Sequence, residues 1–315
     1  MQMIPQMETR AVPGSMRLRR LAGRAAASVA GLLAASGVAA APVSVVAVED
    51  PIRQSSFSLD FGAFGGVASA AITQTDFSLE LDADAGTAKF VQYLQDVDAL
   101  ILPGGFSTGR IKVEVVEGSS TGAFDARRGE FNTTELYAVH FEGDLSAFQL
   151  QSPVILPSTS SGVVALSTET GGSVLMDWTG RGQLPNPFLP ETFLEFAYTC
   201  QVSAAFAPEP ETMLSLMLIP RVLNLQLTPG LENSLVGTLD GVLLKINAGK
   251  ETAAINNLSA FINKVEAQSG KRIEVADADD LTASAEGTIQ LLHGGEASAA
   301  WSSIAEPNPK GRNQR

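Results

Sequence analysis

Two groups of aspartates have the residue type and spacing that most directly suggest chemistry in this sequence. Calcium takes about six to eight oxygen ligands, and two or three neighbouring carboxylates begin such a shell, which backbone carbonyls and water complete. Neither group has the full alternating pattern of a dedicated calcium loop, and each has a plainer interpretation, as a hairpin turn or as acidic residues at the start of a helix. Calcium is the only cofactor that the sequence suggests, and the candidate ligands are Asp82 and Asp84, then Asp277, Asp279 and Asp280.

Catalytic groups are scarce. His140 and His293 are the two histidines, and Cys200 is the single cysteine. His140 alternates with apolar neighbours and so predicts a residue on a solvated sheet face, without the partners that a general base needs. Cys200 lies in phase with apolar residues, which predicts a buried, unreactive thiol. We therefore expect no catalytic residues and a protein that is not an enzyme.

The charge and composition of the chain argue against some classes of binding partner. The 315 residues are 45% hydrophobic and 17% charged, which is typical of folded globular domains. The formal net charge is −13, and it becomes −17 if residues 1–40, with five basic and one acidic side chain, are removed. Such a surface repels phosphate groups, so nucleic acids and anionic lipids are poor partners. An unknown protein, a glycan or a surface component fits better.

Residues 1–40 resemble a secretory signal. Arginines between Arg17 and Arg24 precede a run of small and apolar residues from Ala25 to Val38, and Ala39 and Ala40 suit a cleavage site. The run is short and rich in alanine and glycine, which favours removal over a membrane anchor, and we expect no transmembrane helix in the mature chain. The sequence thus predicts an acidic protein that is secreted, periplasmic or held at the cell surface.

Residues 41–207 have the pattern of an antiparallel β domain. Apolar residues alternate with polar ones in many short segments, such as Phe57 to Phe61 and Ile111 to Val115, and turn-forming residues separate them. Such a pattern predicts a β-sandwich or a barrel. The segment from Phe90 to Leu102 fits a strand or a helix, and its neighbours favour a strand. Trp178 and Tyr198 could stack on sugars, but both lie on apolar faces, which favours core packing.

The pattern changes after Pro208. Prolines make residues 208–230 a predicted linker. Residues 231–293 then carry three apolar stripes with helical spacing, around Leu239, Leu258 and Leu281, which predict a small three-helix bundle. Gly249 and Gly270 fall where left-handed caps would end the first two helices. The tail, residues 294–315, is predicted to be disordered. The predicted fold is therefore multidomain, β then α.

The predicted bundle resembles a known helical module. The segment from Ala253 to Ile273, AAINNLSAFINKVEAQSGKRI, and the later Ala278 to Leu281 resemble the FIMAH domain of bacterial secreted and surface proteins. The resemblance covers about residues 231–293 and implies an accessory module without catalytic residues.

Two weaker resemblances concern other segments. Residues 208–221, PEPETMLSLMLIPR, resemble an exosortase sorting signal, although the apolar run is too short to span a bilayer. Phe141 to Ser146 and Ser152 to Leu156 resemble strands of YceI-like barrels, which implies a cavity for an apolar lipid.

Together these features predict a non-enzymatic secreted or surface protein. Its β domain, a β-sandwich in this leading hypothesis, would act in binding, adhesion or surface assembly, and the helices would be accessory. The alternative is a periplasmic barrel that carries an apolar, lipid- or isoprenoid-like ligand.

Overall fold

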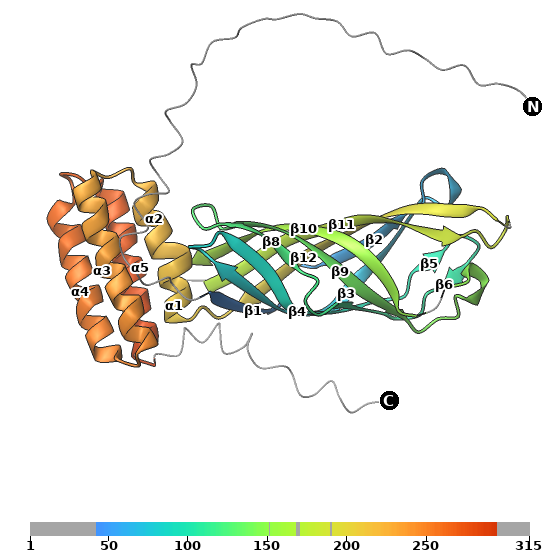
Figure 1. Ribbon diagram of the computed structural model, residues 1–315, viewed down its shortest axis with the longest axis horizontal. Helices are drawn as coiled ribbons and strands as arrows, with labels where there is room; N and C mark the ends of the chain where they lie inside the picture. The colour runs from blue at the N-terminus through green and yellow to red at the C-terminus, as the bar shows by residue number, and fades with distance from the viewer. Residues whose placement is uncertain (1–41, 151, 168–170, 190, 295–315) are drawn as a thin grey trace, which may run out of the picture. The chain divides into compact units, whose positions relative to one another are not determined.

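The computed structural model describes residues 42–150, 152–167, 171–189 and 191–294 (Figure 1). A β region is followed by a helical region, so the predicted order of the two is confirmed. The expected signal segment, residues 1–40, lies outside the described residues, as does the expected tail beyond Gly294. Among the described residues, no helix is both long enough and apolar enough to cross a bilayer.

The β region consists of alternating strands of the kind that the sequence predicts. Residues 87–97 form a strand, as expected for the ambiguous segment after Phe90. The strands are β1 (Val43–Glu49), β2 (Ser56–Asp60), β3 (Val67–Asp82), β4 (Thr87–Val97), β5 (Ile101–Leu102), β6 (Phe106–Ser107), β7 (Ile111–Val115), β8 (Thr121–Asp125), β9 (Glu130–Phe141), β10 (Val154–Ser167), β11 (Gly171–Pro185) and β12 (Phe193–Phe206).

Strand pairing closes the sheet into an antiparallel barrel. β1 and β2 both pair with β3 and with β12, and so occupy one position in the ring. β7 and β8 similarly share the position between β4 and β9. The other neighbours are β3 with β4, β9 with β10, β10 with β11, and β11 with β12. Of the two architectures that the sequence allows, the pairing selects the barrel, because every position in the ring has two partners.

Aromatic side chains fill the interior. Trp178 and Tyr198 are buried, at 0% and 1% exposure, so core packing is confirmed and neither ring is available to a sugar. The centroid of Trp178 lies 4.8 Å from that of Tyr137 and 5.7 Å from that of Tyr198. Rings of this size occupy most of the width of a barrel with eight strand positions.

Glycines on β11 make room for these rings. Gly172, Gly180 and Gly182 lie directly opposite Phe206, Tyr198 and Phe196 on β12. A Cβ atom added at any of the three would overlap the facing ring. The alternation of small and large residues across this pair of strands is what lets the rings lie flat against the wall.

Both ends of the barrel are covered. At one end, near β5 and β6 (Figure 1), Leu102 of β5 is buried in the barrel core, together with Leu100 and Phe148 from connecting segments. At the other, Leu216 of the first helical segment packs against the same core. Leu214 and Leu218, in the same segment, are buried in the helical core instead. This segment therefore joins the two cores.

The helical region contains the three predicted helices and one that was not predicted. α3 (Pro229–Asn247), α4 (Glu251–Gln268) and α5 (Val275–Leu292) match the expected stripes. Gly249 and Gly270 have φ of 66° and 67°, as a left-handed cap requires.

The predicted linker, residues 208–230, is instead helical over most of its length. It forms α1 (Pro210–Met213), a π-helical stretch (Leu214–Leu218) and α2 (Ile219–Asn224). Pro210 is at the first helical position, where its missing N–H costs nothing. The widened turn lies just before Pro220, whose ring would otherwise collide with the carbonyl four residues earlier.

The pairing of glycine with an aromatic ring can be tested by adding one methyl group. We expect Gly180→Ala to destabilise the protein by about 1–3 kcal/mol, because the new Cβ overlaps the Tyr198 ring in a packed interior. Gly237→Ala is the control. Gly237 lies in α3 with open space around it, and the same change there should stabilise by about 0.5–1 kcal/mol. Urea denaturation measures both, and equal effects would contradict this packing.

Candidate functional site

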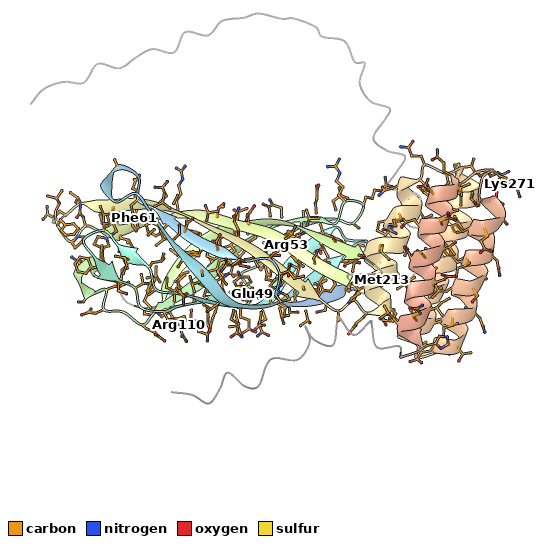
Figure 2. All side chains as sticks on the ribbon, turned by 180° about the vertical axis from the view of Figure 1, so that it is seen from behind. Glu49, Arg53, Phe61, Arg110, Met213 and Lys271 are labelled. Atoms are coloured by element: carbon orange, nitrogen blue, oxygen red, sulfur yellow. The ribbon has the colours of Figure 1, made fainter. Side chains whose placement is uncertain are left out.

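A groove of about 780 Å³ lies on the outer wall of the barrel. It crosses β9, β10, β11 and β12 and reaches the connection between β1 and β2. Arg53, labelled in Figure 2, belongs to that connection and lines the groove. A groove on the wall of a closed, filled barrel can be reached from solvent without opening the fold.

Strand register brings four polar side chains into one row across this groove. Asn132 lies opposite Ser161, Ser161 opposite Asp177, and Asp177 opposite Gln201. All four are exposed, and neighbouring strands lie about 4.8 Å apart. We call these four residues the polar row. It offers two amides, a hydroxyl and a carboxylate in a line perpendicular to the strands.

The polar row is free to bind. Among the described residues, none of its side chains has a hydrogen bond or an ion pair with another side chain or with the backbone. Beside it, Val163 and Leu175 lie directly opposite each other and are 40% and 42% exposed. These two residues, the apolar pair, give the groove a small hydrophobic surface next to its hydrogen-bonding groups.

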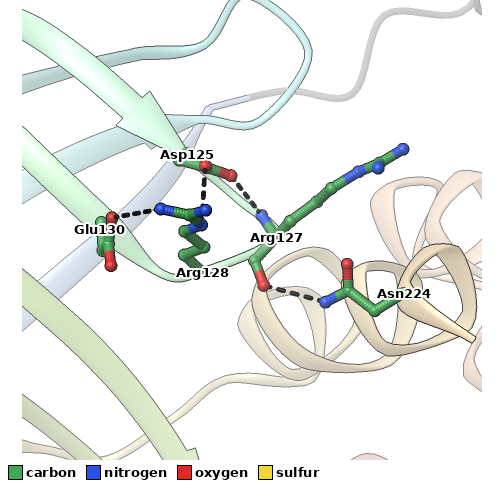
Figure 3. Close-up of polar contacts among 5 residues, drawn as sticks. All are labelled: Asp125, Arg127, Arg128, Glu130 and Asn224. Carbon is green, nitrogen blue, oxygen red and sulfur yellow. Dashed lines mark hydrogen bonds and ion pairs between the residues drawn. The ribbon is translucent and has the colours of Figure 1, made fainter.

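The β8–β9 turn forms one end of the groove and links it to the helices (Figure 3). Arg128 lies between Asp125 and Glu130, with nitrogen–oxygen distances of 3.9 and 3.7 Å. Asn224, at the end of α2, donates a hydrogen bond of 3.0 Å to the carbonyl of Arg127. The carboxylates of Asp125 and Glu130 therefore share the Arg128 guanidinium group. The hydrogen bond from Asn224 fixes the β8–β9 turn to the helical region.

A second polar cluster lies inside the barrel, on β9. Glu135 is 3% exposed and accepts a hydrogen bond from the Ser160 hydroxyl. Its second oxygen, the Thr133 hydroxyl and the Tyr137 hydroxyl are buried and lack hydrogen-bond partners among the described residues. Burial raises the pKa of the Glu135 carboxyl, and the nearby hydroxyls of Ser160, Thr133 and Tyr137 partly oppose this shift.

The structure places the candidate catalytic residues apart from one another. Cys200 is fully buried and lies 3.3 Å from the side-chain amide of Gln95. The predicted burial of Cys200 is confirmed, and burial raises the pKa of its thiol, which favours the protonated form. His140 lies opposite Lys112 of β7, and His293 follows the end of α5. Neither histidine lines the groove.

The candidate calcium ligands lie in two separate places. The Asp82 carboxylate accepts hydrogen bonds from the N–H groups of Asp84 and Ala85, at 3.0 and 2.7 Å, within the β3–β4 hairpin turn. Asp277 and Asp279 lie near the start of α5, and Asp280 forms an ion pair of 2.7 Å with Arg221. Among the described side chains, no group of three or more His, Cys, Asp or Glu is arranged to hold a metal ion. Calcium binding therefore stays an untested prediction.

Sequence reasoning missed the groove. The polar row consists of outward-facing positions of four strands, and only the register places them together. The apolar alternation around Asp177 and Gln201 predicted that these two face solvent. Ser161 lies in a serine- and glycine-rich stretch typical of a turn, and the structure places it in β10 instead.

The buried carboxyl predicts a pH dependence of stability. Because the pKa of Glu135 is raised in the folded state, its ionisation costs stability as pH rises through that pKa, and costs nothing in acid, where the carboxyl is neutral in both states. Glu135→Gln should therefore stabilise the protein at about pH 8, and this gain should shrink towards about pH 4. Glu195→Gln, on an exposed position of β12, is the control and should change little. A gain of equal size at both pH values would argue against a buried, titrating Glu135.

Comparisons with known proteins add nothing to the groove geometry. No protein-family model matches the chain, and a search of curated proteins finds none with significant similarity.

Proposed function

We propose that this chain is an exported, non-enzymatic binding protein that recognises its partner through the groove on the barrel wall. The observation that carries the proposal is the polar row beside the apolar pair: both are exposed, and the polar row has no side-chain hydrogen bond or ion pair with another described residue. Exposed polar groups next to apolar surface are what a binding site offers before its ligand arrives.

Export and surface location are part of the same proposal. They are supported by the signal-like residues 1–40 and by the acidic composition. The helical region is proposed to be a FIMAH-like accessory module. It would position the barrel for adhesion or surface assembly, and the hydrogen bond from Asn224 to the β8–β9 turn ties it to one end of the groove.

The carrier of an apolar ligand remains the second candidate. Closure of the barrel favours it, because a closed barrel can enclose a ligand. The rings of Tyr93, Tyr137 and Trp178 argue against it, because they fill the space that a lipid would need. Native mass spectrometry of the gently purified protein distinguishes the two, since a carrier retains a lipid-sized adduct.

The binding proposal is tested by placing a charge in the groove. We expect the mature chain to co-sediment with cell-envelope preparations of the organism that makes it. Val163→Arg should weaken this binding by roughly tenfold or more, because the change removes one member of the apolar pair and its long side chain, opposite Glu130, fills this part of the groove.

The control is Val91→Arg, at an exposed position on β4, on another part of the barrel wall. It carries the same change and should bind as the unmodified chain does. The proposal fails if the chain does not bind the envelope, or if both variants bind equally well.

A further inference from the structure

We infer that the ligand of this groove is a glycan chain without net charge. The inference rests on the proposed function and names the chemical class that the groove recognises.

The side chains of the polar row match the hydrogen-bonding needs of sugars. Each sugar hydroxyl both donates and accepts, so a site for several hydroxyls needs donors and acceptors close together. The amides of Asn132 and Gln201 supply both, the Asp177 carboxylate accepts, and the Ser161 hydroxyl does either. Their spacing of about 4.8 Å from strand to strand lets a chain of rings meet a new polar group along its length.

The charges of the groove favour a neutral ligand. Asp125 and Glu130 share Arg128 at one end. The remaining charges on its wall are Asp177 and Arg53, which are opposite in sign and have no ion pair with each other or with other described residues. With Arg128 counted, three carboxylates face two guanidinium groups, and this excess of negative charge repels a strongly anionic chain. A neutral polyhydroxylated chain meets no net repulsion.

The barrel disfavours the common modes of peptide binding. An extended peptide adds to a sheet through a free strand edge, and the ring of strand positions leaves none on this wall. An amphipathic helix needs a continuous apolar groove, and the polar row runs across this one. Val163 and Leu175 offer a patch of the size that packs against the C–H face of a sugar ring.

The experiment divides the envelope preparation into three portions, one untreated, one oxidised with periodate, which cleaves vicinal diols, and one digested with protease. Periodate should abolish binding and protease should leave it intact. Gln201→Ala and Asn132→Ala should each weaken binding to the untreated portion by about tenfold or more, since they remove contacts from a hydrogen-bonding site. Gln92→Ala, an exposed glutamine on β4, is the matched control.

Three results overturn the inference. Loss of binding after protease, with Val163→Arg still impaired, would mean a protein ligand and would leave the binding function standing. Periodate-sensitive binding that Gln201→Ala and Asn132→Ala do not change would place the glycan elsewhere. Competition by an anionic but not by a neutral soluble polysaccharide would contradict a neutral ligand.

Discussion

The pairing of β12 with β1 and β2 is the constraint on which the rest of this structure depends. Residues 43–60 and 193–206 lie far apart in the sequence, yet Thr199 faces Ser58 and Ala205 faces Val48. This contact turns a row of hairpins into a ring. It gives each wall position a partner on both sides, and it separates an inner face, which must be filled, from an outer face, which solvent reaches.

Because side chains fill the inner face of the barrel, we place the proposed binding site on its outer face. Large rings opposite glycines on β11 use the available width, and connecting segments and Leu216 cover the ends. The polar groups left inside, around Glu135, are few and largely enclosed. On the outer face the same alternation leaves Asn132, Ser161, Asp177 and Gln201 exposed and adjacent. The surface that we propose for recognition is therefore a consequence of closure, because the register of the paired strands assembles it.

Most of the strands and helices could be predicted from the sequence, because each is indicated by the spacing of apolar residues within its own segment. The alternation in β3 and β9 and the helical stripe of α4 follow directly from which neighbours are apolar. Closure could not be predicted in this way, since it depends on pairing between distant segments. Residues 210–224 were missed because their prolines indicate a break, although Pro210 starts a helix and a widened turn precedes Pro220.

The candidate site was less predictable, for a related reason. A polar residue on the outer face of a strand is unremarkable alone, and a shift of one residue in register would turn Asp177 inward and replace it with Met176 or Trp178. One feature of the sequence does bear on the register of β11 and β12. The observed register places each of three glycines on β11 opposite an aromatic ring on β12, where a larger residue would overlap the ring. The aspartates, by contrast, are conspicuous in sequence, yet Asp82 bonds to its own turn and Asp280 pairs with Arg221.

Amide hydrogen exchange of β2 and β12 tests the closed barrel most directly. If β2 pairs with β12 as described, the amides of residues 56–60 and 197–201 that bond across this junction should exchange as slowly as those between β10 and β11. Exchange at the rate of exposed loops, with β10 and β11 still protected, would mean an open sheet with two free edges. In that case peptide addition to an edge would become possible, and the argument that places recognition on the outer wall would fail.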